Sequence, residues 1–233
     1  MTTLIIAATD LEISWLTGQL HARPEKPLLD FPVYHAEGIL LIICGPGMAN
    51  AAAATAAAIE RYRPEQIYNT GICGVYSEDS TLLSLAVVGA QAVFADTGAA
   101  ADTDFQSLRS MNLPLASAAG KNIYNTIKLN CDAVPHDSMR ADFLTVAAVS
   151  GSPAMAAKLS GRFTPPAGTL LCEDMESAAI GLVALRAGIP CTVVRGISNL
   201  CGERDHACWE IRQAAQAAQE LLLEILWRHE KTS

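Results

Sequence analysis

The sequence is poor in charge and has no long apolar run. Asp, Glu, Lys and Arg together make up 17% of its 233 residues. No apolar stretch reaches the roughly 18 residues that a membrane-spanning helix needs. The formal net charge of −8 argues against a nucleic-acid groove, which requires a surplus of Lys and Arg. We therefore expect a protein that binds neither nucleic acid nor a membrane.

Cysteine pairs and metal-ligand spacings are also absent. The seven cysteines include no CxxC pair, and the five histidines follow no ligand spacing. These patterns argue against a disulfide framework and a metal site. The opening MTTLIIAATD lacks the basic segment of a signal peptide. We expect a cytoplasmic protein without a bound metal.

Apolar strand-like runs alternate with amphipathic helical ones along the chain. Strands are expected at 3–9, 39–47, 66–74, 82–96, 143–151 and 189–198, with a further strand leading into a helix at 168–188. This alternation predicts a three-layer α/β/α sandwich with a central mixed sheet that is buried on both faces. No repeat or linker interrupts it, so residues 1–233 are expected to form a single domain.

Two further segments stand out. The stretch from 205 to 229 carries an apolar stripe that predicts a long terminal helix. The stretch 97–142 is rich in Ala, Asp, Asn and Pro and has few strand or helix signals. Long irregular segments of this kind often cover a site or form an interface.

Three acids, Glu173, Asp174 and Glu176, end the apolar run at 168–174. Acids in the first turn of a helix stabilise its dipole, which is one interpretation. Small residues directly after Glu176 would place its carboxylate in a tightly packed environment. A carboxylate that accepts two hydroxyl hydrogen bonds also suits a ribose diol, so both interpretations stay open.

Polar residues follow other strands. Glu12 lies among apolar neighbours after the first strand, where a raised pKa would let it act as a general base on water. A solvated acid at a helix start is the alternative. Ser198 and Asn199 lie at the end of the strand expected at 189–198. Their side chains either bind a ligand or form hydrogen bonds with the local backbone in a turn. The glycine turn TGICG allows close backbone approach to a ligand, or is simply a tight turn.

Five motifs follow one another along the chain, namely AATDLEISWL, CGPGMANAAAA, NTGICG, EDMESAAI and VVRGISN. Their order and spacing resemble those of the purine nucleoside phosphorylase and nucleosidase superfamily over nearly the whole chain. The resemblance is strongest to the hydrolytic branch, the methylthioadenosine/S-adenosylhomocysteine nucleosidases and the futalosine hydrolases. It implies a nucleoside phosphorylase-like fold and no metal or organic cofactor. It also implies a homodimer or higher homo-oligomer in which the irregular region reaches the neighbouring site.

The resemblance implies roles on the sugar side of a nucleoside. Glu12 matches the acid that activates the attacking water, and Glu176 matches the acceptor of the ribose hydroxyl protons. Met175 lies under the ribose, Asp174 lines the same site, and Trp209 matches an aromatic residue that closes the 5′ side.

On the base side, Gly74 belongs to the glycine turn, and Ser198 with Asn199 matches a Ser-Asp pair beside the purine. An Asn amide can donate to a carbonyl, so Asn199 suits a 6-oxopurine such as hypoxanthine. Together with the following G-x-RD and Trp, this favours futalosine as substrate, with hypoxanthine released in the alternative menaquinone route. An adenine-directed nucleosidase, acting on methylthioadenosine, S-adenosylhomocysteine or aminofutalosine, remains the main alternative.

Arginines that hold phosphate in the phosphorylase branch have no match before Arg23 or in 72–79. Without them phosphate would enter an acid-lined site at a cost, so water is the expected nucleophile. A phosphorylase and a silent nucleoside-binding protein remain alternatives. A cationic partner for the carboxylate of the futalosine 5′ substituent is not decided among Arg109, Lys121 and Lys128.

Overall fold

The structure is a computed structural model that describes residues 2–101, 104–132 and 134–232. The strands are β1 (Thr3–Ala7), β2 (Arg23–Pro24), β3 (Val33–Ala36), β4 (Ile39–Ile43), β5 (Gln66–Val75), β6 (Ala86–Phe94), β7 (Gly98–Ala100), β8 (Phe105–Ser107), β9 (Ala116–Ala118), β10 (Lys121–Ile123), β11 (Thr126–Lys128), β12 (Arg140–Thr145), β13 (Thr169–Asp174) and β14 (Cys191–Leu200). The α-helices are α1 (Ser14–Gln19), α2 (Met48–Tyr62), α3 (Pro153–Ser160), α4 (Ser177–Ala187) and α5 (Ile211–Thr232). Short 3-10 helices are η1 (Asp10–Glu12), η2 (Ser80–Leu82) and η3 (His206–Cys208).

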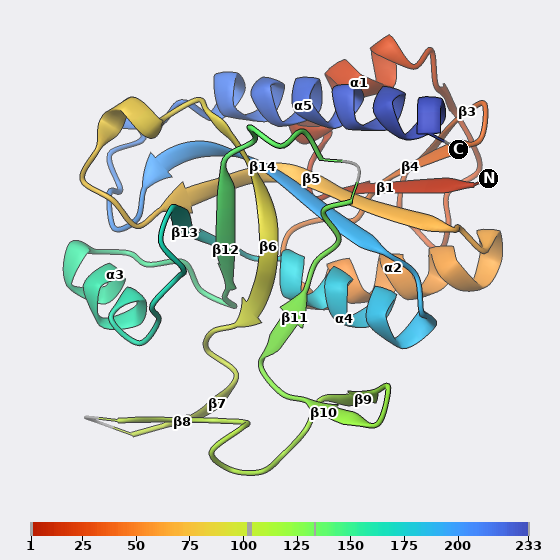
Figure 1. Ribbon diagram of the computed structural model, residues 1–233. Helices are drawn as coiled ribbons and strands as arrows, with labels where there is room; N and C mark the ends of the chain where they lie inside the picture. Colours follow the sequence, from red (N-terminus) through yellow and green to blue (C-terminus); the bar gives the residue numbers. More distant parts are fainter. Residues whose placement is uncertain (1, 102–103, 133, 233) are drawn as a thin grey trace.

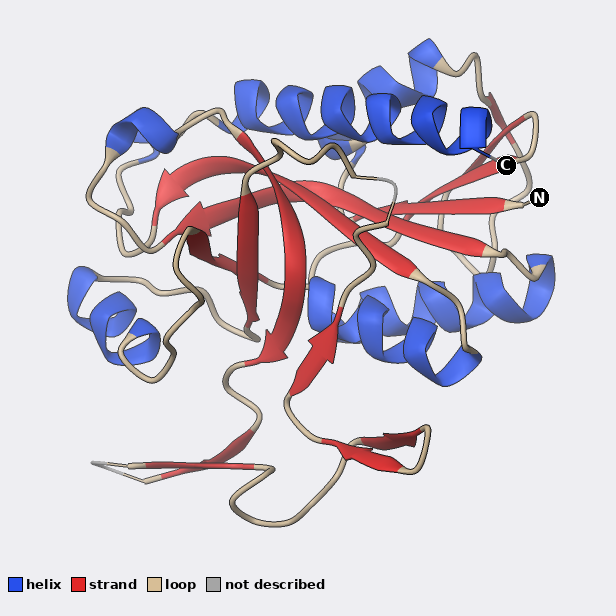
Figure 2. Ribbon diagram, viewed as in Figure 1, coloured by secondary structure: helices blue, strands red, loops and turns tan. Residues whose placement is uncertain are grey.

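One large mixed sheet forms the centre of the molecule. Its strand order is β11-β6-β12-β13-β5-β1-β4-β3-β2, and β14 pairs with both β5 and β6. Helices α1 and α5 cover one side of the sheet and α2 and α4 the other (Figures 1 and 2). The predicted three-layer α/β/α arrangement with a central mixed sheet is confirmed. Among the described residues, no helix is long and apolar enough to cross a membrane.

The double pairing of β14 makes part of the sheet close on itself. Strands β5, β14, β6, β12 and β13 are joined in a ring, because β13 pairs in turn with β5. In the pairing, Glu173 of β13 and Asn199 of β14 both lie opposite Gly74 of β5. Closure therefore brings two strand ends that are far apart in the sequence to the same point of β5.

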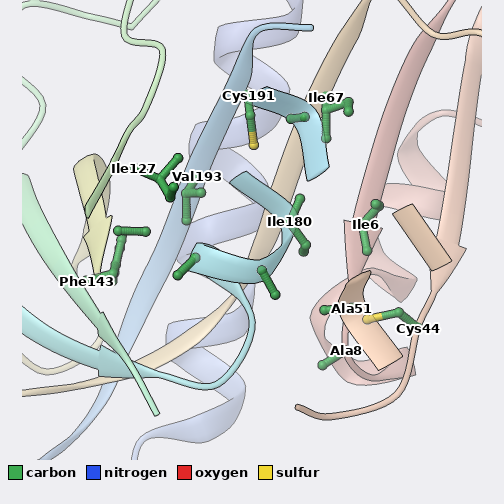
Figure 3. Close-up of a cluster of buried hydrophobic side chains, with 14 of the residues drawn as sticks. Ile6, Ala8, Cys44, Ala51, Ile67, Ile127, Phe143, Ile180, Cys191 and Val193 are labelled. Atoms are coloured by element: carbon green, nitrogen blue, oxygen red, sulfur yellow. The ribbon is translucent and has the colours of Figure 1, made fainter. Parts of the chain in front are cut away.

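Small side chains let the helices pack closely on this sheet. Ala51, Ala54 and Ala58 of α2 are fully buried, as is Ile180 of α4. Figure 3 shows Ile180 and Ala51 in the same core cluster as strand side chains such as Ile6. Alanine has a high helix propensity, and its small side chain also permits this close approach of helix and sheet. A second core cluster joins the opposite side of the sheet to α5.

Several boundaries differ from the sequence prediction. The terminal helix begins at Ile211 rather than near 205, because the Asp205 side chain caps η3 and Trp209 is extended. The strand expected at 143–151 is β12, which ends at Thr145, and Ser152 then caps α3. Within 97–142 the structure contains two short hairpins, β7–β8 and β9–β10. They project from the body of the molecule (Figure 1), and we call residues 97–101 and 104–125 the arm.

Candidate active site

Glu12 is buried and held by hydrogen bonds at the end of η1, the short 3-10 helix that follows β1. Its side chain accepts hydrogen bonds from the Thr9 backbone N–H (2.9 Å) and hydroxyl (2.8 Å) at Oε2. The Ile72 N–H of β5 donates to Oε1 at 2.9 Å. The sequence suggested a carboxylate among apolar neighbours, whereas the structure surrounds it with three donors. These donors fix both oxygens of Glu12 and hold its side chain against β5 at Ile72.

Asp174 lies at the end of β13 and is completely enclosed. The Thr145 hydroxyl donates to its Oδ1 at 2.6 Å, and the Ser177 N–H and hydroxyl donate to Oδ2. Arg195 forms an ion pair with the same Oδ2 at 2.9 Å, and neither side chain is exposed. Asp174 therefore holds Arg195, and its carboxylate has no remaining surface that a substrate could reach.

Arg195 is the central residue that the sequence prediction did not assign. It lies in β14 within the apolar run TVVRGIS and is 0% exposed. Its Nη2 contacts Asp174, Glu176 (3.3 Å) and the Asn69 side-chain oxygen (2.7 Å). An arginine inside an otherwise apolar strand was the available signal, since a buried cation requires partners.

Carboxylates on three sides keep Arg195 charged. Burial alone lowers the pKa of Arg195, but Asp174, Glu176 and Glu12 raise it above the usual value. Its Nε and Nη1 have no hydrogen-bond partner among the described residues. Arg195 therefore supplies a buried positive charge with free donors at the centre of the acids.

Glu176 precedes α4 and faces the glycine turn before α2. The Gly47 N–H donates to its Oε1 at 2.9 Å, while Oε2 faces Arg195. Burial raises the pKa of Glu176, Asp174 raises it further, and Arg195 acts in the opposite direction. Both oxygens keep lone pairs that can accept further hydrogen bonds.

Ser198 and Asn199 form the other end of the site. The Ser198 hydroxyl lies within hydrogen-bond distance of the Cys73 carbonyl (3.1 Å) and of Asn199 Oδ1 (2.8 Å). The Asn199 amide nitrogen donates to the Leu200 carbonyl at 3.1 Å. A methyl group at Gly74 would lie 2.9 Å from Cys201 Sγ and 3.2 Å from that nitrogen, so the glycine leaves room for both side chains.

Strand β5 connects these two ends through consecutive residues. Ile72 binds Glu12, Cys73 contacts Ser198, and Gly74 lies beside Asn199. A methyl group at Gly71 would overlap Arg195 Nη1 and lie 2.6 Å from Glu12 Oε1. Residues 71 to 74 of an extended strand span roughly 10 Å. The acids and the amide are thus separated by about the length of a nucleoside.

Met175 and Trp209 are less closely tied to this centre. Met175 is half-buried between Asp174 and Glu176. Trp209 stacks on His206 at 4.6 Å, and its ring nitrogen donates to the Glu203 carbonyl at 3.2 Å. These contacts stay within the loop after β14, so the predicted role of Trp209 at the 5′ side remains a prediction.

The net charge around Arg195 affects whether phosphate or water is the favoured nucleophile. The sequence argument assumed that no cation was available to hold phosphate, and Arg195 corrects that assumption. Its charge is matched by Asp174 and Glu176, and Glu12 adds a third carboxylate nearby. The centre stays negative, which favours a cationic sugar over an anionic nucleophile. No cluster of potential metal ligands occurs among the described residues.

The relatives with which this chain aligns over nearly its whole length are named nucleosidases, which places it among the N-glycosyl hydrolases. The chain belongs to the phosphorylase superfamily, whose family model matches residues 2–228. A 5′-methylthioadenosine/S-adenosylhomocysteine nucleosidase from Psychromonas ingrahamii is 26% identical over 95% of this chain and 96% of its own.

Two solved structures illustrate the likeness in fold. S-adenosylhomocysteine nucleosidase from Streptococcus pyogenes, in complex with 5-methylthiotubericidin, superposes with a TM-score of 0.77 at 22% identity and covers 97% of this chain and 96% of its own. A futalosine hydrolase mutant from Helicobacter pylori gives 0.75 at 17% identity, with coverage of 97% and 99%. Because both sequence identities are below 25%, these two structures establish the fold alone.

Proposed function

We propose that the protein is a purine nucleosidase that uses water to cleave the bond between ribose and base. Glu12 activates the water, Glu176 binds the ribose hydroxyls and Asn199 hydrogen-bonds the departing purine. The observation that carries this proposal is β5, which sets Glu12 and Arg195 at Gly71 and Asn199 at Gly74. This separation suits a nucleoside with its sugar at the acids and its base at the amide.

Gly71 lets Arg195 and Glu12 approach β5 closely, because a side chain at this position would displace both. Arg195 Nη1 has no hydrogen-bond partner among the described residues. In the proposed reaction a water donates a hydrogen bond to Glu12, which then takes its proton. The surrounding carboxylates stabilise the oxocarbenium character of the sugar in the transition state.

The relatives favour an adenine nucleoside as substrate. The similar proteins from Psychromonas ingrahamii and Bacillus subtilis are both named 5′-methylthioadenosine/S-adenosylhomocysteine nucleosidases, at 26% and 25% identity over nearly the whole chain. This supports an adenine-directed nucleosidase as the first candidate.

Asn199 favours a second candidate. Its side-chain oxygen accepts from the Ser198 hydroxyl and one amide N–H binds the Leu200 carbonyl, which leaves the second N–H as a donor for a base. A donor suits the O6 atom of hypoxanthine and opposes the exocyclic amine of adenine. Futalosine hydrolysis, yielding hypoxanthine and dehypoxanthine futalosine for menaquinone synthesis, is therefore the 6-oxopurine candidate.

One incubation experiment separates these candidates. The purified protein is mixed with futalosine, aminofutalosine, methylthioadenosine or inosine, each with and without phosphate, and the released base is identified. Release of adenine or hypoxanthine without phosphate supports a nucleosidase and names its base. Strict dependence on phosphate would identify a phosphorylase, and binding without release a silent nucleoside-binding protein.

A further inference from the structure

Gln219 is a buried polar residue that the proposed mechanism does not use. It lies in α5 and is only 1% exposed. On the same face of the helix, Ala215, Leu222 and Leu223 are buried and apolar. A buried amide costs free energy unless its donors and its acceptor are paired. The hydrogen-bond partners of Gln219 therefore indicate what this side chain holds in place.

Both ends of the Gln219 amide bind the segment that carries Glu12. Its Oε1 accepts from the Leu16 N–H at 3.0 Å, and its Nε2 donates to the Leu11 carbonyl at 3.3 Å. Nε2 also donates to the Ala215 carbonyl of α5 at 2.8 Å. The acceptor and both donors of the amide are thus used within the protein.

These contacts span an interruption between η1 and α1. Helix α1 begins after Ile13, whose backbone (φ −139°, ψ −16°) is not helical and whose apolar side chain cannot cap the helix. The first N–H groups of a helix have no acceptor within the helix itself. Gln219 supplies an acceptor for Leu16 from a different helix, as an N-cap side chain does locally. Glu12 is the last residue of η1, so it lies between the two backbone groups that Gln219 binds.

Helix α5 is also fixed to β14, the strand that carries Arg195. A methyl group at Gly196 would overlap the backbone of Ala214, so α5 lies directly on β14 beside Arg195. Figure 1 shows α5 crossing β14 and continuing alongside α1. Gln219 follows Ala214 by about 7.5 Å along the helix axis. The helix therefore relates the position of the segment around Glu12 to that of β14.

We propose that Gln219 is a positioning residue that sets Glu12 relative to Arg195. It holds the backbone on both sides of Glu12, while Thr9 and Ile72 hold the carboxylate. Without the Gln219 hydrogen bonds this backbone could shift, and a displacement of about 1 Å at a catalytic group can cost about 100-fold in rate. The inference rests on the proposed function, because it assigns Gln219 a role through Glu12.

The first test separates positioning from folding. Gln219→Met removes the hydrogen bonds, whereas Leu222→Ala removes buried apolar surface from the same helix face and leaves them in place. In Gln219→Met, kcat for the preferred nucleoside should fall about tenfold or more, with KM within about twofold, because Glu176 and Asn199 still bind the nucleoside. Leu222→Ala should lower the melting temperature at least as much and keep kcat within about twofold. Equal falls in kcat, or a change confined to KM, would overturn the inference.

Amide hydrogen exchange tests the inference without an activity assay. The N–H groups of Thr9 and Ile72 donate to Glu12, so their exchange reports how firmly its carboxylate is held. In Gln219→Met both should exchange about tenfold faster relative to the amides of β4. In Leu222→Ala these amides should all change together. Unchanged relative exchange of Thr9 and Ile72 in Gln219→Met would overturn the inference.

The two tests also distinguish this inference from the proposed function. If the wild type releases base from none of the four nucleosides, the proposed function is wrong, and the exchange measurement still decides whether Gln219 positions Glu12. If Gln219→Met does not fold, Gln219→Glu replaces it, because this side chain has the same length and keeps an acceptor for the Leu16 N–H. The same directions of change are expected. Wild-type kcat and exchange in that variant would overturn the inference.

Discussion

Charge is arranged in opposite ways in the centre of the candidate active site and in the cavity of about 820 Å³ between the arm, the end of β6 and α3. In the centre, Arg195 is fully buried and each carboxylate around it accepts several hydrogen bonds. In the cavity, Arg109, Lys158 and Arg162 are exposed and form no ion pair with described residues. The charges of the first arrangement are satisfied by contacts within the protein, whereas the cations of the second remain exposed to solvent.

This difference has a physical basis in the strands that carry the two regions. The centre lies on β5, β13 and β14, which are buried and paired within the closed part of the sheet. The cavity is bounded by the arm, whose short strands pair only as isolated hairpins. Substitutions of charged residues in the centre should therefore cost much stability, and substitutions of the exposed cations at the cavity should cost little.

The largest effect is expected from the two glutamates. Glu12→Gln and Glu176→Gln should each lower kcat by about 10²- to 10⁴-fold, because the amide can neither take a proton from water nor stabilise a cationic sugar. Base release is measured with the preferred nucleoside, and circular dichroism checks the fold. Glu60→Gln, an exposed acid on α2, is the control. Normal turnover in both variants would remove the proposed mechanism.

Loss of the central cation should appear as instability. Arg195→Met leaves Asp174 and Glu176 buried without their counter-charge, and we expect a loss of about 3–5 kcal/mol in the free energy of unfolding. Urea denaturation measures it. Arg162→Met at the cavity should cost less than about 1 kcal/mol, since an exposed cation contributes little. Similar losses in both variants would contradict the contrast between the two regions.

A change of base preference is expected at Asn199. Asn199→Asp replaces an amide donor with a carboxylate, which opposes a carbonyl and can accept from an exocyclic amine. The ratio of kcat/KM for hypoxanthine over adenine nucleosides should fall by about tenfold or more. The comparison uses inosine with adenosine and futalosine with aminofutalosine. An unchanged ratio would show that Asn199 does not select the base.

The smallest effect is expected at the junction of the two regions. Glu173 accepts hydrogen bonds from the Tyr76 hydroxyl at 2.6 Å and from Ser150, and so connects β5 to the loop beside the cavity. Tyr76→Phe removes one of these donors and should raise KM about two- to tenfold while kcat changes less. Tyr62→Phe on α2 is the control. An equal fall in kcat would place Tyr76 in the chemistry rather than in positioning.

Much of the fold could be predicted from the sequence because runs of apolar residues indicate buried segments. The buried strands, the alanine-rich helix and the layered arrangement follow from local patterns. The hairpins of the arm were missed because their three-residue strands bury few side chains. The early start assigned to α5 was wrong because the Asp205 cap belongs to η3, and sequence alone cannot distinguish a short turn from a long helix at its first residues.

The sequence by itself determined which residues are candidates for the chemistry: Glu12 and Glu176 follow apolar strands and Asn199 lies at the end of one, where a polar side chain needs an explanation. Only the tertiary structure decided how they are connected. The closure of β14 onto β5 and β6 buries Arg195 between Asp174 and Glu176 and lets β5 space the acids from Asn199. The reason is that a charge in an apolar strand has no partner within its own segment. Its partners come from strands that meet only when the sheet closes.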